Sequence, residues 1–123
     1  MPVFSYATST INSTFWSVIY GADQNNYIMG AHIFCSASYN VCNLPCDHAY
    51  SVLAAFNFTV SNGTIVQAVM ARNPWGSVGY NGSLSSKDTI WTNSTILSKV
   101  PLGVNPITDA ASYGIFIVPI TSF

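Results

Sequence analysis

The stretch from Asp47 to Gly76 constrains the fold of this chain more than any other part of the sequence. Two apolar runs, 50–60 and 65–71, flank the turn signal Ser61-Asn62-Gly63-Thr64. An Asn-Gly pair between β-rich runs is the strongest short-range signal of a hairpin, because both residues tolerate the positive φ of a type I′ turn. The sequence therefore predicts a long antiparallel hairpin that turns at Asn62-Gly63.

Two polar side chains are predicted to meet at the open end of this hairpin. Counted outward from the turn, Asn73 falls opposite roughly Val52, and His48 lies about two ladder steps beyond. Pro74 favours an extended backbone at Asn73 and ends strand pairing there. We therefore expect an imidazole and a carboxamide at one end of a rigid hairpin, which is a suitable platform for catalysis.

The rest of the chain predicts one helix and further strands. Apolar residues at helical spacing predict a short helix from about Thr14 to Asn25-Asn26: Phe15, Val18, Ile19 and Ala22. Residues 27–34 and 115–118 read as strands, and Trp91 is expected to anchor the polar stretch 76–99. This pattern favours an α+β fold, mainly antiparallel β, in a single domain spanning 1–123.

The composition limits the classes of partner. Half of the 123 residues are apolar, which is enough for a core, but only 6% are charged, where about 25% is usual. The net charge is −1, so we expect no nucleic-acid partner. A weakly charged surface opposes self-association little, which suits a homo-oligomer, a filament or a glycosylated chain.

Signals for the cellular compartment conflict. No apolar run approaches the ~18 residues that span a bilayer, and the first residues lack the pattern of a signal peptide. We expect either a cytoplasmic chain or one whose leader lies outside this sequence. Against a cytoplasmic location stand N-glycosylation sequons, which point to the secretory pathway or the cell exterior, at Asn12, Asn57, Asn62, Asn81 and Asn93.

Two motifs at the open end of the hairpin resemble the histidine and asparagine motifs of calpain-type cysteine proteases, which belong to the papain-like superfamily. They are Asp47-His48-Ala49-Tyr50-Ser51-Val52 and Arg72-Asn73-Pro74-Trp75-Gly76. The segments 22–31 and 113–120 also resemble parts of that protease core. The resemblance covers most of the chain from about Phe15 onward.

The resemblance implies roles for three residues. In the family, the histidine shuttles a proton to and from a cysteine thiolate, and the asparagine oxygen accepts a hydrogen bond from the other ring nitrogen. A tryptophan covers that hydrogen bond. By matching position, these roles fall to His48, Asn73 and Trp75. The fold implied is the β-barrel-like C-terminal half of a papain-like protease, whose other half carries the nucleophile.

The chain departs from the family at the nucleophile and at the calcium-binding residues. The family nucleophile stands upstream in a Gln-Gly-x-x-Gly-x-Cys-Trp-type context at a helix start, and no cysteine here matches it. The acidic residues expected to bind calcium after Trp75 are reduced to Asp88 in the segment 82–88, so calcium is not expected.

Two functional hypotheses follow. In the first, the chain is a peptidase subdomain that supplies His48 and Asn73, is inactive alone, and acts with a cysteine-bearing chain. In the second, it is a catalytically dead barrel that serves as a structural or assembly subunit, extracellular and glycosylated. The plain structural alternatives remain open: His48 as a core histidine, Asn73 as a turn residue and Trp75 as a core aromatic.

The cysteines allow further chemistry. A disulfide between Cys42 and Cys46 would close the shortest loop and leave Cys35 to link to another chain. A zinc site formed by the cysteines and His48 is not favoured, because the spacing lacks a Cys-x-x-Cys pair. Buried thiols are the remaining alternative. We therefore expect no cofactor.

Overall fold

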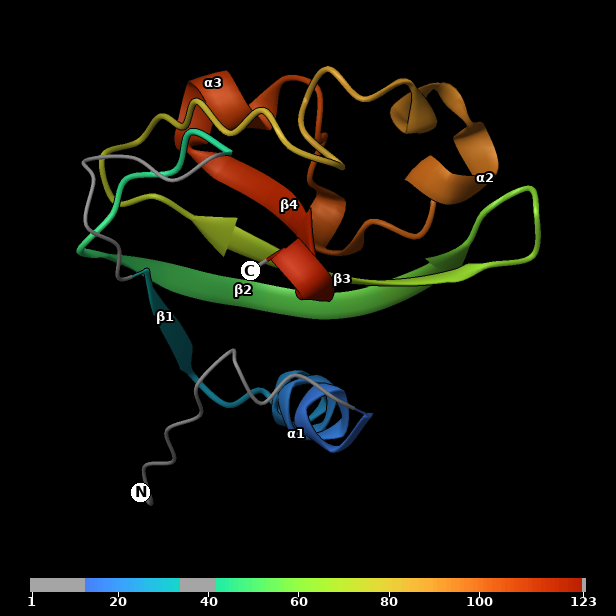
Figure 1. The fold of residues 1–123 in the computed structure, drawn as a ribbon, viewed down its shortest axis with the longest axis horizontal. Coiled ribbons are helices and arrows are strands. Elements are labelled where there is room, and N and C mark those ends of the chain that lie inside the picture. Colours follow the sequence, from blue (N-terminus) through green and yellow to red (C-terminus); the bar gives the residue numbers. More distant parts are fainter. Residues whose placement is uncertain (1–12, 34–41, 123) are drawn as a thin grey trace.

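The computed structural model describes residues 13–33 and 42–122. Its centre is a four-stranded antiparallel sheet in the order β1 (Met29–Ile33), β2 (His48–Thr59), β3 (Ile65–Arg72) and β4 (Ile115–Pro119) (Figure 1). The predicted α+β class, mainly antiparallel β, is confirmed. The predicted barrel-like closure is not found. Strands β1 and β4 are the edges of an open sheet, so the described strands do not form a barrel.

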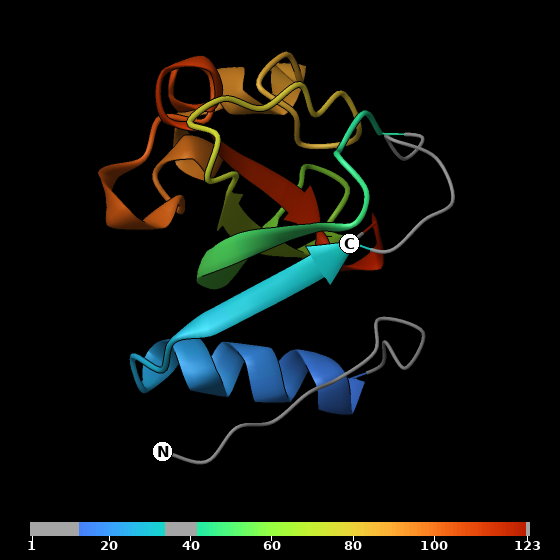
Figure 2. The ribbon, with the colours of Figure 1, turned by 90° about the vertical axis from the view of Figure 1, so that its left-hand side faces the viewer.

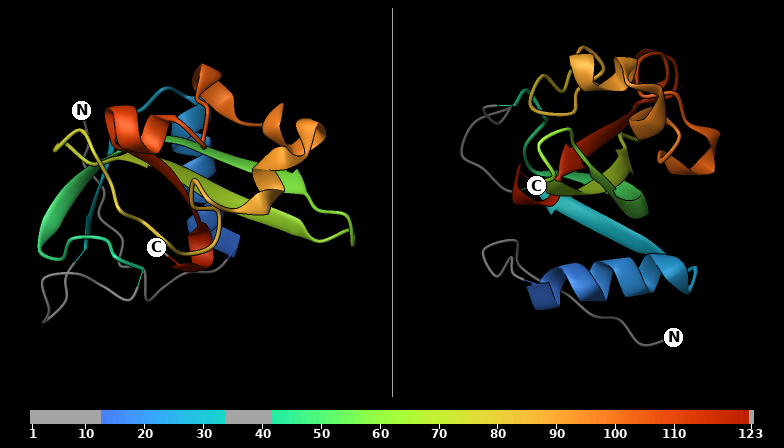
Figure 3. Two further views of the ribbon diagram at one scale, coloured as in Figure 1. Left: turned by 90° about the horizontal axis from the view of Figure 1, so that it is seen from above. Right: turned by 90° about the vertical axis from the view of Figure 1, so that its right-hand side faces the viewer.

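Helices lie on opposite sides of this sheet. The helix α1 (Ser13–Gln24) contacts β2, whereas the connection from β3 to β4 covers the other side (Figures 2 and 3). That connection contains the short elements η2 (Thr89–Thr92), α2 (Ser94–Leu97), η3 (Pro101–Gly103) and α3 (Asp109–Tyr113), and η4 (Ile120–Ser122) follows β4. None of the helices in the described residues is long and apolar enough to cross a membrane.

The N-terminal helix is confirmed, and a residue outside the predicted apolar stripe takes part in its packing. Trp16 is buried, and Ile19 of the predicted stripe and Tyr20 pack against the same cluster. The rings of Trp16 and Tyr20 stack with centroids 5.6 Å apart. The helix therefore packs against the sheet through Trp16, and Tyr20 stacks on the ring of Trp16.

Each face of the sheet carries its own apolar cluster. The α1-side cluster consists of Trp16, Leu44, Tyr50, Ala55, Val69, Ala71, Tyr80, Phe116, Val118 and Ile120. The connection-side cluster consists of Ala54, Phe56, Phe58, Ala68, Met70, Leu84, Trp91, Ile96 and Ile117. Neighbouring residues of β3 and β4 alternate between the two clusters, as strand geometry requires.

The hairpin of β2 and β3 is confirmed, but its turn is not type I′. The amide of Gly63 donates to the carbonyl of Val60 at 2.9 Å, and the amide of Val60 donates to the carbonyl of Thr64 at 2.9 Å. Within this tip only Gly63 has a positive φ, of 86°. This is a three-residue loop with glycine in the left-handed position, which is another common hairpin connection.

A bulge at Leu53 changes the register of the hairpin. Val52 pairs with Ala71 but Ala54 pairs with Met70, so Leu53 has no partner of its own on β3. Ser51 then pairs with Arg72, and the ladder carried one residue further places Asn73 beside Tyr50 rather than Val52. His48 therefore lies closer to Asn73 than an unbroken ladder predicts.

The long connection is anchored by Trp91, as predicted, which is only 1% exposed. Its indole nitrogen donates to the carbonyls of Leu84 at 3.2 Å and Ser85 at 3.0 Å. The carboxylate of Asp88 accepts hydrogen bonds from the amides of Leu84 at 2.9 Å and Ile90 at 3.0 Å. These bonds order a segment that has little regular structure.

Gly114 joins α3 to β4 in a position that only glycine fits. It has a φ of 72° and ends α3 in the left-handed conformation. A Cβ atom there would lie 2.8 Å from the carbonyl oxygen of Asn73 and 2.8 Å from the amide nitrogen of Ser77. The carbonyl of Gly114 also accepts from the amide of Asn73 at 2.9 Å. The backbone that carries Asn73 is therefore packed directly against Gly114.

We predict that Gly114→Ala destabilises the fold by about 3 kcal/mol or more, because backbone strain and a backbone clash combine. Gly103→Ala is the matched control, since Gly103 has a φ of 67° and a Cβ atom added there would have no neighbour within 4 Å. It should cost only about 1 kcal/mol, from strain alone. Urea unfolding followed by tryptophan fluorescence measures both. Equal losses of stability in the two variants would contradict the packing argument.

A second prediction concerns alkaline pH. Burial raises the pKa of the Tyr80 phenol, with Cys42 and Asp88 adding to the effect, and its hydroxyl donates to the carbonyl of Ser83 at 2.6 Å. The unfolded chain loses this proton near the ordinary pKa of 10.0, whereas the folded chain retains it. Stability should therefore fall as the pH rises above about 10.

Tyr80→Phe should remove part of this alkaline loss, and Tyr27→Phe, at an exposed tyrosine, should not. The measurement is the free energy of unfolding of each variant at about pH 9 and about pH 11. A wild-type loss that persists unchanged in Tyr80→Phe would assign the effect to other groups.

Candidate functional site

His48 and Asn73 meet at the open end of the hairpin. His48 is the first residue of β2, and Asn73 directly follows β3. The Nε2 atom of His48 lies 2.9 Å from the Oδ1 atom of Asn73. His48 is half-buried, whereas Asn73 is 1% exposed. The structure thus brings together the two side chains that the hairpin predicts, and their catalytic role remains a prediction.

The hydrogen bonds of Asn73 define which ring nitrogen of His48 carries the proton. Oδ1 of Asn73 also accepts from the backbone amide of Trp75 at 3.1 Å, and an N–H group can only donate. This atom is therefore the amide oxygen, and Nε2 of His48 must donate to it. In the neutral ring, Nδ1 is left as the proton acceptor.

Two aromatic rings hold the imidazole in place. Trp75 lies against His48 with ring centroids 4.4 Å apart and an angle of 45° between the planes. Its side chain is 61% exposed, so most of its surface faces solvent while the ring lies against His48. Tyr50 meets His48 edge-on at 5.1 Å, and its hydroxyl donates to the carbonyl of Pro45 at 2.8 Å.

The sequence Asn-Pro-Trp-Gly forms a tight turn that aims Asn73 at the histidine. The amide of Gly76 donates to the carbonyl of Asn73 at 3.0 Å, and Gly76 has a φ of 79°. Pro74 cannot donate to a ladder, so β3 ends at Arg72. Arg72 in turn donates from Nε to the carbonyl of Tyr113 at 3.0 Å. The turn is therefore fixed at both ends.

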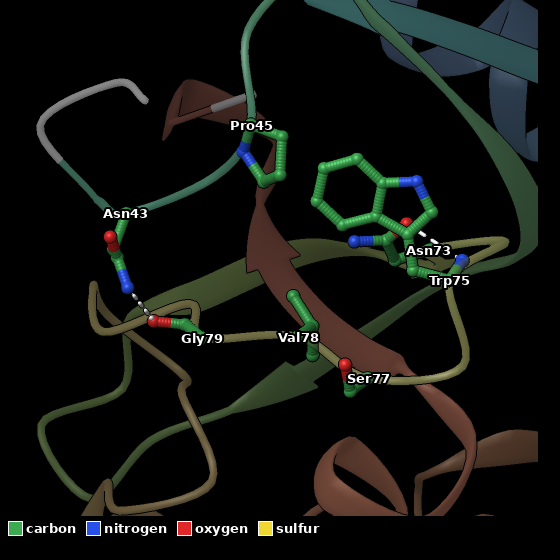
Figure 4. A pocket seen from close by; sticks show the side chains of 7 residues that line it. All are labelled: Asn43, Pro45, Asn73, Trp75, Ser77, Val78 and Gly79. Atoms are coloured by element: carbon green, nitrogen blue, oxygen red, sulfur yellow. Dashed lines mark hydrogen bonds between the residues drawn. The ribbon is translucent and has the colours of Figure 1, made fainter. Parts of the chain in front are cut away.

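The loop before His48 is tied to the segment that follows Trp75. Asn43 donates from Nδ2 to the carbonyl of Gly79 at 2.9 Å, and the amide of Asn81 donates to the carbonyl of Cys42 at 3.0 Å. Asn43 and Asp47 both have a positive φ, of 62° and 49°. A pocket lies between these two segments, beside Asn73 (Figure 4).

The predicted disulfide between Cys42 and Cys46 is wrong. Cys46 is disulfide-bonded, but Cys42 is a thiol. Its sulfur lies beside Tyr80, because a Cβ atom added to Gly82 would be 2.9 Å from Sγ of Cys42 and 2.7 Å from Oη of Tyr80. The third cysteine of the sequence, Cys35, lies outside the described residues. Among the described residues, no group of three or more His, Cys, Asp and Glu side chains is arranged to hold a metal ion.

The sequons of the described chain are accessible. Asn57, Asn62, Asn81 and Asn93 are exposed, and Asn12 lies outside the described residues. Two of them use Oδ1 locally: Asn62 accepts from the amide of Thr64 at 2.9 Å, and Asn93 accepts from that of Thr95 at 3.0 Å. Their glycosylation remains a prediction.

Sequence reasoning missed two residues that support the site. Tyr50 belongs to the predicted strand, and its position after His48 in the strand alternation could have indicated a shared face. Gly114 could have been found as a glycine between a helix and an apolar strand, a usual place for a left-handed residue. The contact of Gly114 with the backbone of Asn73 had no signal in the sequence.

The arrangement amounts to an imidazole whose Nε2–H is fixed and whose Nδ1 is available to take up and return a proton. A comparison with known families agrees with the chemistry of this pair. The family described as calpain family cysteine protease matches residues 2–116, which is nearly the whole chain. The chain therefore belongs to the calpain family of cysteine proteases.

Proposed function

We propose that this chain supplies the histidine and asparagine of a calpain-family peptidase whose nucleophilic cysteine stands on another polypeptide. The observation that carries the proposal is the 2.9 Å bond between Nε2 of His48 and Oδ1 of Asn73. This bond fixes the tautomer and the ring plane, which is what a general base requires of its orienting partner.

In the proposed mechanism, Nδ1 of His48 accepts the proton of the incoming thiol. The thiolate attacks the peptide carbonyl, and His48 returns the proton to the leaving amine as the acyl-thioester forms. A water molecule then hydrolyses the acyl-thioester, with Nδ1 again acting as the base. Asn73 stabilises the imidazolium that forms in each step, and Trp75 keeps water from one side of the pair.

The chain is proposed to be inactive on its own. Its sequence has no cysteine in the family's nucleophile context. The sulfur of Cys46 is engaged in a disulfide, and that of Cys42 lies beside Tyr80. The proposal also includes no calcium, because the carboxylate of Asp88 already accepts the amides of Leu84 and Ile90.

A second candidate function is a protease-derived structural or assembly subunit. It is favoured by the exposed sequons, the charge content of 6% and the disulfide at Cys46, since disulfides persist mainly in oxidising compartments. In that case the partner would be another protein chain or further copies of this one. His48 and Asn73 would then serve only to order the end of the hairpin.

A hydrolysis assay with a fluorogenic peptide tests the first proposal. The isolated chain should show no turnover above the blank. Mixed with the cysteine-bearing half of a calpain-family protease, it should restore hydrolysis. His48→Ala should lower the restored rate about 10³-fold or more, and Asn73→Ala by at least about tenfold.

His32→Ala is the matched control, because His32 is the other histidine of the chain and is exposed on β1. It should leave the restored rate unchanged. Turnover by the isolated chain that disappears in His48→Ala would refute the proposed inactivity. A folded mixture with no hydrolysis would favour the structural subunit.

A further inference from the structure

Two Asn-Gly pairs occur in the sequence, Asn62-Gly63 and Asn81-Gly82. An asparagine that precedes glycine loses its side-chain amide most readily, because glycine has no Cβ atom to hinder the attack of its own backbone nitrogen on the carboxamide. Both asparagines are exposed, so contact with solvent does not distinguish the two pairs. The hydrogen bonds at each pair do distinguish them.

The pair at the tip of the hairpin is held in an unreactive arrangement. The amide of Gly63 donates to the carbonyl of Val60 at 2.9 Å, and Oδ1 of Asn62 accepts from the amide of Thr64 at 2.9 Å. The nitrogen that would attack and the carboxamide that would be attacked are therefore each engaged, although the tip projects beyond the rest of the sheet (Figure 1). Both hydrogen bonds must break before the two groups can react.

The pair Asn81-Gly82 lacks these restraints. Within the part of the chain that the structure describes, the amide of Gly82 donates no hydrogen bond and the carboxamide of Asn81 forms none. The flanking backbone groups are held, because the amide of Asn81 donates to Cys42 at 3.0 Å and the carbonyl of Gly82 accepts from Ser85 at 3.1 Å. Both reacting groups are therefore available on an ordered backbone.

Packing explains why glycine follows Asn81. A Cβ atom added to Gly82 would lie 2.7 Å from Oη of Tyr80 and 2.9 Å from Sγ of Cys42. A side chain at this position would hinder the attack on Asn81, but the structure has no room for one. The fold thus requires the residue that makes Asn81 reactive.

We propose that Asn81 is a site of spontaneous deamidation in the folded chain. The amide nitrogen of Gly82, after losing its proton to hydroxide, attacks Cγ of Asn81 and closes a succinimide ring. The bond from Cγ to Nδ2 breaks, and the nitrogen leaves as ammonia after taking up a proton from water. Water then opens the ring at either carbonyl, which leaves aspartate or isoaspartate. The inference is independent of the proposed function.

The isoaspartate product would disturb a connection between two loops. It adds one carbon atom to the main chain directly before Gly82, where packing against Tyr80 leaves no room. The amide of Asn81 is the donor that ties this segment to Cys42, in the loop before His48. Deamidation therefore strains the contact that holds this loop.

Peptide mapping of the unglycosylated chain, incubated at mildly alkaline pH, tests the proposal. Trypsin cleaves after Arg72 and Lys87, so the peptide 73–87 carries Asn81 and the peptide 1–72 carries Asn62. Mass spectrometry of the folded chain should show deamidation at Asn81 about tenfold faster or more than at Asn62, because the two hydrogen bonds at the hairpin tip must break first. In guanidinium chloride the two rates should become similar.

Labelling by an isoaspartyl methyltransferase, which transfers a methyl group to isoaspartate, gives an independent measurement. After incubation, Asn81→Gln should take up little of the label that the wild type takes up, because glutamine forms the corresponding ring much more slowly. Asn62→Gln is the matched control, since it changes the exposed asparagine of the other Asn-Gly pair, and it should take up nearly as much label as the wild type.

Equal rates at the two asparagines of the folded chain, or a faster reaction at Asn62, would overturn the proposal. Full labelling of incubated Asn81→Gln would overturn it as well. The wild type deamidated at Asn81 should also unfold at a lower denaturant concentration than the fresh chain, and equal midpoints would contradict the strained contact.

Discussion

The candidate site depends on the bulge at Leu53, because the bulge decides which face of the sheet His48 occupies. Facing residues of an antiparallel ladder share a face, and side chains alternate along each strand. On the turn side of the bulge, Ala54 points into the connection-side cluster. His48 lies an even number of residues before Ala54, so an unbroken strand would place it on that face. Asn73 lies two residues after Ala71, which belongs to the α1-side cluster, so Asn73 would lie on the opposite face, that of α1. The extra residue reverses the alternation, and His48 joins the face of Asn73.

Asn73 then acts as the junction of the site, because its hydrogen-bonding groups connect separate parts of the fold. Its backbone amide donates to the carbonyl of Gly114, which precedes β4, and its carbonyl accepts from Gly76 to close the turn. Its side-chain oxygen accepts from His48 and Trp75. A change at Gly114 or Gly76 therefore reaches the imidazole through the backbone of Asn73. This explains why an open sheet, without the closure of a barrel, can still hold an imidazole and a carboxamide at hydrogen-bonding distance.

The sequence predicted the parts of this fold that local chemistry specifies. A signal in the local residues marks four features: the Asn62-Gly63 turn, the helix before Asn25, the strand before Pro119 and the anchor at Trp91.

The meeting of His48 and Asn73 was also predicted, but from a two-residue turn and an unbroken ladder. The longer turn and the bulge each shift the register by one residue, and the two shifts together preserve the shared face. Leu53 is one apolar residue within an apolar run, so no local signal marks it as the bulge. The packing of Gly114 and the pocket depend on contacts between distant segments, which spacing along the chain does not specify.

The exposure of Trp75 beside His48 leaves room for a partner chain at the site. Trp75 covers His48 with one face and leaves 61% of its surface exposed, although tryptophan usually buries most of its area in a folded chain. Among residues 13–33 and 42–122, no side chain or backbone group hydrogen-bonds to Nδ1 of His48, whereas Nε2 is bound to Asn73. Under the proposed function, a cysteine-bearing partner would bring a thiol to Nδ1. With a charge content of 6%, such a partner would have to be recognised by shape, apolar contact and hydrogen bonds more than by long-range attraction. Under that proposal, this chain would supply the fixed and the available nitrogen of the proton shuttle, and the partner would supply the nucleophile.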